Sequence, residues 1–384
     1  MKRFAITTGM AEHPDVLILG GGVIGLTTAW LLSEAGVRVT LVDKGDFGHQ
    51  ASWAGAGIIS PGKLSQARTA MDQLRARSTA LFPVLSRKLY EQTGIDNGYA
   101  VCGGLELISS ADEADSEEWR SEGIAFHELT GDELRRRYPY LAPGLDRAFY
   151  LPEMAQVRNP RHLQALQAVC AARGVSMRPN CPARGLVRNG SRIDAVETDQ
   201  GRLTAGRYLI ATGAWTAGLL EPLELRPGIH PVRGQIALLN TGTSERLPLL
   251  LQGKRYLVPR GDGRILVGST EEDAGFEAHT TAVAIAGLLD FAVSLMPQLA
   301  QATVERCWAG LRPGSPDGKP FLGAVPGLDN LYIAAGHFRA GIQLSPATAL
   351  VMKEVLLGET PTIALDDFRL DRAANPPART AFRS

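Results

Sequence analysis

The chain has no excess of either charge and no long hydrophobic segment. Its 384 residues carry 40 basic and 40 acidic side chains, so the formal net charge is zero. Proteins that bind nucleic acids usually have a basic surface, and this balance therefore argues against a nucleic-acid partner. No apolar run approaches the ~20 residues that span a bilayer. The apolar stretch from Phe4 to Ile6 is too short for the core of a signal peptide. We expect a cytoplasmic protein with no integral membrane segment.

The four cysteines form no pattern typical of a disulfide framework or a zinc site. Cys102, Cys170, Cys181 and Cys307 lie far apart, and no pair has the C-x-x-C spacing. Disulfide-rich domains and metal sites need closer or more regular cysteines. We therefore predict buried thiols in a reducing compartment and no metal ion.

Length and composition indicate a globular protein of two or three domains. Apolar residues make up 45% of the chain and charged residues 21%, close to the average for globular proteins. Such a chain is able to bury a sizeable core.

A βαβ unit is predicted near the N-terminus, around a glycine-rich turn. Val16 to Leu19 is a short apolar run of the kind found in buried parallel strands. A helix is expected over 23–35, with Gly36 as its stop, and a second strand over 37–42. Asp43 stands at the end of that strand.

The turn has the spacing Gly20-x-Gly22-x-x-Gly25, which is typical of dinucleotide sites. Gly20 permits the tight turn, Gly22 lets the backbone approach a pyrophosphate, and Gly25 lets helix and strand pack closely. The N-terminus of the helix offers unpaired N–H groups to the phosphates. Asp43 is placed to accept a hydrogen bond from a ribose hydroxyl. The alternative is a glycine-rich turn without a ligand, but strand, helix and acid all occupy the required positions.

Periodicity and turn residues predict the remaining elements. Helices are expected over 71–90, 161–173, 281–295 and, as a solvated pair, 111–137. Strands or hairpins are expected over 208–213, 236–270 and 330–336. We predict a final helix with Ser345 as N-cap and Pro346 as its first residue, closed by Gly358.

Three further features favour FAD over NAD. The small residues of 51–57 would let a backbone segment lie against a bulky ring system. The segment 211–213 ends a strand in glycine, a pattern found beside flavin sites. The segment 336–341 precedes a helix whose N-terminus would stabilise negative charge on a reduced ring. Each feature alone is equally consistent with a structural turn, but together they favour a long cofactor.

These segments resemble the D-amino-acid-oxidase family of flavoproteins, and within it the glycine oxidases. The matching segments occur in family order and cover nearly the whole chain. The most specific are Trp-Ala-Gly-Leu-Arg-Pro at 308–313 and Gly-His-Phe-Arg-Ala-Gly-Ile at 336–342. The others are 20–25, 52–58, 256–260, 267–270 and 317–320.

The resemblance implies an α/β fold of two interleaved domains. A Rossmann-like FAD-binding domain would cover 14–90, 150–222 and 320–384. A substrate-binding domain built on an antiparallel sheet would cover 91–149 and 223–319.

The resemblance also implies three residues of the substrate site. Arg312 looks like the arginine that pairs with the substrate carboxylate, and Tyr256 like the tyrosine whose hydroxyl completes that contact. Arg339 looks like the arginine beside flavin and substrate. A guanidinium grips a carboxylate in two places, a geometry that lysine lacks. Without the motif, Arg312 would be interpreted as a surface ion-pair residue and Tyr256 as a half-buried strand residue.

The same matching predicts the residues that contact non-covalent FAD. They are Gly20, Gly22, Val23, Ile24, Gly25, Asp43, Lys44, Ala51, Ser52, Ala56, Gly57, Ile58, Ala183, His337, Phe338, Arg339, Ala340, Gly341, Ile342 and Gln343. His337 is interpreted as a backbone contact rather than as a general base.

By resemblance, the chain oxidises a small amino acid or amine such as glycine, sarcosine or a D-amino acid. The α-hydrogen would leave as hydride to the flavin, and water would hydrolyse the imine to a 2-oxo acid and ammonia. Molecular oxygen would reoxidise the flavin and give hydrogen peroxide, so the protein need supply only orientation and electrostatics. If glycine is the substrate, the imine would feed thiazole formation in thiamine synthesis. Relatives are often homotetramers, and we expect a homo-oligomer by that analogy.

Three positions depart from the family pattern. Lys254 stands near where some glycine oxidases carry a histidine, and Glu271 where an apolar side chain often lines the pocket. If Glu271 faces inward it would favour a cationic or larger amine; otherwise it is a solvated hairpin residue. Relatives with covalent flavin carry a cysteine near the position matched to Gly310, whereas Cys307 is three residues away.

Other functions stay open at this point. A dehydrogenase of the same fold would pass electrons to a quinone or carrier protein, and a relative of the sarcosine oxidases would prefer N-methylated or cyclic amines. A nucleotide-binding module without turnover, an NAD dehydrogenase and a flavin-dependent RNA-modifying enzyme fit the residues less well.

Overall fold

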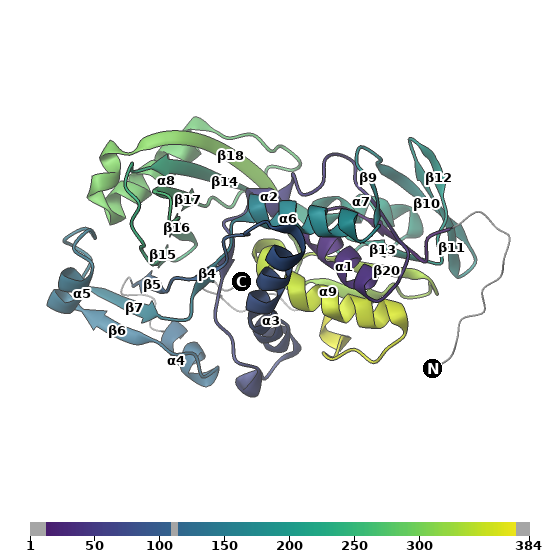
Figure 1. The fold of residues 1–384 in the computed structure, drawn as a ribbon, viewed down its shortest axis with the longest axis horizontal. Helices are drawn as coiled ribbons and strands as arrows, with labels where there is room; N and C mark the ends of the chain where they lie inside the picture. The colour runs from purple at the N-terminus through teal and green to yellow at the C-terminus, as the bar shows by residue number, and fades with distance from the viewer. Residues whose placement is uncertain (1–12, 109–113, 374–384) are drawn as a thin grey trace.

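The structure, a computed structural model, describes residues 13–108 and 114–373. It has the mixed α/β two-domain fold predicted from the sequence, with one largely parallel sheet and one largely antiparallel sheet. In Figure 1 the parallel sheet lies at the right, beside α1 and α9, and the antiparallel sheet lies at the left, beside α8.

The first sheet has six strands in the order β19-β20-β13-β1-β2-β9, and only β19 is antiparallel to its neighbour. Apart from Arg207 at the start of β13, its two central strands are apolar and buried on both faces, as a parallel sheet between two layers requires. The strands are β1 (Val16–Leu19), β2 (Val39–Val42), β9 (Ser176–Arg178), β13 (Arg207–Ile210), β19 (Phe321–Ala324) and β20 (Leu331–Ala335).

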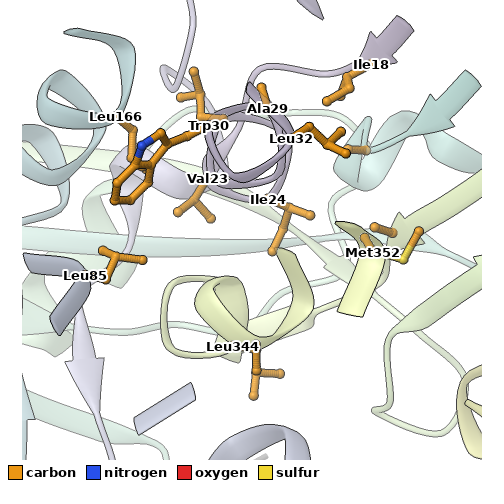
Figure 2. Packing of buried hydrophobic residues seen from close by; sticks show 14 of the residues in the cluster. Ile18, Val23, Ile24, Ala29, Trp30, Leu32, Leu85, Leu166, Leu344 and Met352 are labelled. Atoms are coloured by element: carbon orange, nitrogen blue, oxygen red, sulfur yellow. The ribbon is translucent and has the colours of Figure 1, made fainter. Parts of the chain in front are cut away.

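Helices cover one face of this sheet. The covering helices are α1 (Val23–Glu34), α3 (Ala70–Thr93), α6 (Asn159–Ala172) and α9 (Gly341–Leu357). Val16 and Ile18 of β1 form one core cluster with residues of these four helices, and Figure 2 shows part of that cluster around Trp30. Leu17 and Leu19 point to the opposite face, as alternation along a strand requires. They pack toward a layer made of α7 (Thr216–Leu220), β10 (Ala183–Asn189), β11 (Arg192–Thr198) and β12 (Gly201–Leu203).

The second sheet has eight strands in the order β18-β14-β17-β16-β15-β5-β7-β6. Only the pair β15 and β5 is parallel. The strands are β5 (Gly104–Leu107), β6 (His127–Thr130), β7 (Arg147–Leu151), β14 (His230–Asn240), β15 (Leu249–Gln252), β16 (Arg255–Pro259), β17 (Arg264–Gly268) and β18 (Thr303–Gly314). Ala237, Leu257 and Val267 face α8 (Ala282–Leu295), whereas Ile236, Tyr256 and Leu266 face the other side.

Smaller elements connect the two sheets. Strands β3 (Ile58–Ile59), β8 (Ala155–Gln156) and β4 (Ala100–Val101) form a small sheet, and α2 (Ala51–Ala54) precedes β3. The predicted pair of helices over 111–137 is α4 (Ala114–Ser121) and α5 (Gly131–Arg137), with β6 between them. Residues 111–113 of that prediction lie outside the described ranges.

The predicted start of the final helix was wrong. Helix α9 begins at Gly341, after a 3₁₀ turn over Phe338–Ala340, so Pro346 lies inside the helix. Proline lacks the N–H that would bond to the carbonyl of Ile342. The hydroxyl of Ser345 donates to that carbonyl at 2.9 Å, and the N–H of Ala347 donates to Ser78 of α3 at 3.1 Å. A neighbouring side chain of the same helix thus satisfies the carbonyl that the proline leaves free, and a contact with α3 satisfies the N–H of the next residue. The predicted end at Gly358 is confirmed, since this residue is left-handed with φ +74°.

The two sheets draw on alternating parts of the chain. The six-stranded sheet takes its strands from 14–90, 150–222 and 320–384, and the eight-stranded sheet takes all but the end of β7 from 91–149 and 223–319. The domain boundaries themselves stay a prediction, and residues 374–384 lie outside the described ranges. All four cysteines are free thiols. In the described ranges, no helix combines the length and the apolar character needed to span a bilayer.

Candidate active site

A cavity of about 670 Å³ lies between the two sheets. Its lining comes from β1, β2 and β20 on one side and from β14, β16 and β18 on the other. The volume is in the range of small-molecule and cofactor sites. All of the cofactor and substrate residues predicted from the sequence line this cavity, with the single exception of Gly25.

The glycine turn is packed too tightly for side chains. Gly20 has φ +107°, and a Cβ atom there would lie 2.3 Å from the carbonyl oxygen of Ala211. A Cβ atom at Gly25 would lie 1.9 Å from the carbonyl oxygen of Gly20. Gly25 therefore serves helix–strand packing, the role expected of it, and does not reach the cavity. Helix α1 begins directly at the cavity with no acidic residue in its first turn. No carboxylate of its own first turn therefore offsets the positive end of its dipole, and the N–H of Val23 donates to the Ser52 hydroxyl at 3.0 Å.

Asp43 and Lys44 line the cavity at the end of β2. The N–H groups of Gly21 and Gly45 donate to the two Asp43 carboxylate oxygens at 2.7 and 2.9 Å. Burial raises the pKa of Asp43, while these hydrogen bonds and the charge of Lys44 oppose the rise. The Lys44 Nζ atom lies 3.2 Å from the centre of the Trp215 ring. Burial lowers the pKa of Lys44.

The segment 51–58 is held along the cavity by side chains from three other parts of the chain. The Asn159 amide donates to the carbonyl of Ser52 at 2.8 Å, and the Trp308 indole donates to the carbonyl of Ala54 at 3.0 Å. The buried Arg260 guanidinium donates to the carbonyl of Ala56 at 2.7 Å. Alternate carbonyls are thus fixed by both domains, which gives this predicted flavin-contacting segment a defined position.

Arg312 and Tyr256 converge across the cavity face of the eight-stranded sheet. Arg312 lies on β18 and Tyr256 on β16, with β14 and β17 between them. The intervening positions are glycines: a Cβ atom at Gly234 would lie 2.1 Å from Arg312 Nη2. A Cβ atom at Gly268 would lie 2.6 Å from the Tyr256 hydroxyl oxygen. The two long side chains therefore lie flat over a stretch of bare backbone, one from each side.

Arg312 donates hydrogen bonds to two neutral oxygen atoms beside the cavity. Its Nη2 donates to the Ser269 hydroxyl at 2.7 Å and its Nη1 to the Thr270 carbonyl at 3.1 Å. Among the described residues, no carboxylate lies within ion-pair distance of this guanidinium. Burial lowers the pKa of Arg312, and Tyr256 and Glu271 oppose the shift. A cation in such surroundings favours an anionic partner.

Arg339, unlike Arg312, forms an ion pair with a carboxylate of the chain. Its Nη2 lies 2.8 Å from Glu271 Oε2, and its Nε donates to the same oxygen at 3.1 Å. The other oxygen of Glu271 accepts from Lys254 Nζ at 3.0 Å. Glu271 does not line the cavity; it is an exposed residue and the centre of an ion cluster beside it.

The contacts of His337 and Cys307 agree with the roles predicted for them. His337 is buried and its Nε2 lies 3.1 Å from Thr348 Oγ1, and burial lowers the pKa of His337 to about 3. It is therefore neutral at pH 7, which agrees with a packing role. Cys307 pairs with Ala237 and packs in the core on the α8 side of the sheet, away from the cavity. At Gly310, a Cβ atom would lie 2.5 Å from Ala54 Cβ, so this position accepts no side chain without a shift.

Sequence reasoning missed several residues of the site. Gly234, Ser269 and Trp215 line the cavity, and Arg260 holds its wall. Ser269 and Arg260 stand inside segments that matched the family, but no role was assigned to them. The role of Gly234 depends on which strand lies beside β18, and sequence alone does not supply that register.

Comparison with known proteins places the chain in a family. Residues 15–355 match the family described as FAD dependent oxidoreductase, DAO. Glycine oxidase from Pseudomonas putida (strain KT2440) is 38% identical over 353 residues, which is 91% of this chain and 96% of that protein. Hydrogen cyanide synthase subunit HcnC from Pseudomonas aeruginosa is 34% identical over 415 residues, covering 96% and 98%.

A solved structure agrees with this match. The crystal structure of glycine oxidase from Geobacillus kaustophilus superposes with a TM-score of 0.89 at 31% identity, covering 95% of this chain and all of that one. The resemblance inferred from the sequence motifs is thereby confirmed: this chain belongs to the DAO family of FAD-dependent oxidoreductases and is similar to glycine oxidases.

Proposed function

We propose that this chain binds FAD non-covalently in the cavity and oxidises a small amino acid or amine, with molecular oxygen as electron acceptor. Glycine, sarcosine and small D-amino acids are the candidate substrates. The products would be a 2-oxo acid, ammonia and hydrogen peroxide when the substrate is a primary amine.

The residues around the cavity fit FAD. The tight turn at Gly20 and the N-terminus of α1 at the cavity suit a pyrophosphate, and Asp43 suits a ribose hydroxyl. The fixed segment 51–58 and the turn at 337–343 would flank the ring system. The position of Cys307 on the far side of the sheet supports non-covalent binding.

One observation carries the proposal: the Arg312 guanidinium lies at the cavity without a carboxylate partner from the described part of the chain. A substrate carboxylate would supply that partner through two parallel hydrogen bonds. Tyr256, which reaches the same place from the opposite strand, would add a third contact. These contacts fix the orientation of a substrate that has few other atoms.

The chain's own residues then need only to bind and orient. Bound FAD supplies the two-electron oxidation of the carbon–nitrogen bond. The electrons and protons that leave the substrate C–H and N–H reduce oxygen to hydrogen peroxide, and water replaces the nitrogen as the oxo group. His337 is neutral and buried against Thr348, so we assign it no proton transfer.

The function is tested by the visible spectrum of the purified protein and a peroxide assay. We expect a yellow protein that forms peroxide and ammonia in equal amounts with glycine or a D-amino acid. Sarcosine and proline test the preference for N-substituted amines. Turnover with an artificial acceptor but without oxygen uptake would identify a dehydrogenase, and a colourless protein would contradict the proposal.

Arg312→Lys should weaken substrate binding while leaving FAD content unchanged. A charge-assisted contact is worth about 1.5–3 kcal/mol, so we expect KM to rise by roughly 10- to 100-fold. The matched control is Arg306→Lys on the same strand, whose guanidinium lies over Trp53 rather than at the cavity. Equal kinetic constants for wild type and Arg312→Lys would remove the carboxylate assignment.

Gly234→Ala should have a similar effect without altering any charged residue. The new Cβ atom would meet Arg312 Nη2 at 2.1 Å and displace the guanidinium from the sheet. We expect roughly tenfold weaker binding of acetate, measured by its perturbation of the flavin spectrum, because the two-point contact is lost. Gly185→Ala is the control, since its Cβ atom would meet nothing closer than 4.0 Å. Unchanged acetate affinity in Gly234→Ala would show that the position of Arg312 does not matter.

A further inference from the structure

Three cations and one carboxylate gather at the substrate end of the cavity. Arg312 and Arg339 line the cavity, and Lys254 lies on the turn between β15 and β16. The carboxylate is that of Glu271, which follows β17. Which of these cations pair with Glu271 determines how many cations remain to bind anionic groups of a substrate.

Glu271 uses both of its oxygen atoms on these cations. Oε2 binds Arg339 at 2.8 Å and Oε1 binds Lys254 at 3.0 Å. The Arg339 side chain is 11% exposed and that of Glu271 29%, whereas Lys254 is 65% exposed. The Arg339 pair is therefore the more shielded of the two and the more resistant to salt.

The neighbours of Glu271 in the chain hold its backbone in place. On one side, the carbonyl of Thr270 accepts from Arg312 at 3.1 Å. On the other, Glu272 forms a β-bridge and an ion pair with Arg233, which is buried in β14. Because successive side chains of an extended segment point to opposite sides, Glu272 on Arg233 directs Glu271 toward Arg339.

Glu271 is ionised at neutral pH. Burial alone would raise its pKa, but the hydrogen bond from Lys254 and the charges of Arg339, Lys254 and Arg312 together lower it. Arg339 is thus neutralised by the protein, whereas Arg312 is not. Of the two guanidinium groups, Arg312 is the one without a carboxylate partner among the described residues.

We propose that Glu271 is a specificity-determining residue that restricts the site to amines with one carboxylate. It occupies Arg339, and its own negative charge repels a second anionic group on the substrate. This inference rests on the proposed function, because it presumes that Arg312 binds the first carboxylate. Replacing Glu271 with a neutral residue would turn Arg339 into a second anion receptor.

The test compares two N-substituted glycines of nearly equal size, iminodiacetate and its monoamide. They differ in the charge of the second arm. In Glu271→Gln, we expect kcat/KM for iminodiacetate relative to the monoamide to rise at least tenfold over the wild-type ratio. The gain should be lost in the double variant Glu271→Gln/Arg339→Met. Glu277→Gln removes the same charge from an exposed position of the same loop and should leave the ratio unchanged.

A binding measurement separates failure of this inference from failure of the proposed function. Dissociation constants of acetate and malonate are measured on the FAD-loaded proteins by spectral perturbation. We expect Glu271→Gln to tighten malonate at least tenfold relative to acetate. If acetate binds wild type and the malonate-to-acetate ratio does not change in Glu271→Gln, the role of Glu271 is wrong. If acetate does not bind wild type, the carboxylate site itself is wrong.

Discussion

The site depends on one electrostatic constraint, the placement of an arginine cation on a glycine-lined surface of the sheet. Arg312 lies over Gly234 and donates to Ser269 and Thr270, none of which neutralises its charge. Placing a cation in a partly desolvated site is unfavourable unless an anion completes it. The proposed substrate carboxylate would be that anion, so binding and orientation would follow from the same interaction.

The rest of the architecture brings this cation to the cofactor cavity. The β1–α1 turn and the eight-stranded sheet come from different domains, and both line the same cavity. The segment 51–58 joins them, since Asn159, Trp308 and Arg260 fix its alternate carbonyls from both sides. Glu271 forms an ion pair with Arg339 beside the cavity. In the proposed site, this pair would leave Arg312 as the receptor for the substrate carboxylate.

Much of the fold was predictable because short sequence patterns indicate its elements. The apolar run of β1 and the spacing of Gly20, Gly22 and Gly25 indicate a parallel strand, a turn and a helix within 20 residues of sequence. The start of α9 was not predictable in the same way. Pro346 lies inside the helix, where Ser78, distant in sequence, accepts the N–H of Ala347.

The residues of the site likewise differ in whether local sequence identifies them. The motifs identified Arg312, Tyr256 and Arg339, all of which line the cavity, but not Gly234, whose function arises from strand register. The partner of Glu271 was also beyond sequence reasoning, because Arg339 stands 68 residues away.

A crystal structure of the FAD-loaded protein with acetate bound is the decisive measurement for the role of Arg312. We expect both carboxylate oxygens to lie about 3 Å from the Arg312 guanidinium nitrogens, at the end of the cavity near Tyr256. Acetate bound elsewhere, with the Arg312 guanidinium turned away from the cavity, would contradict it.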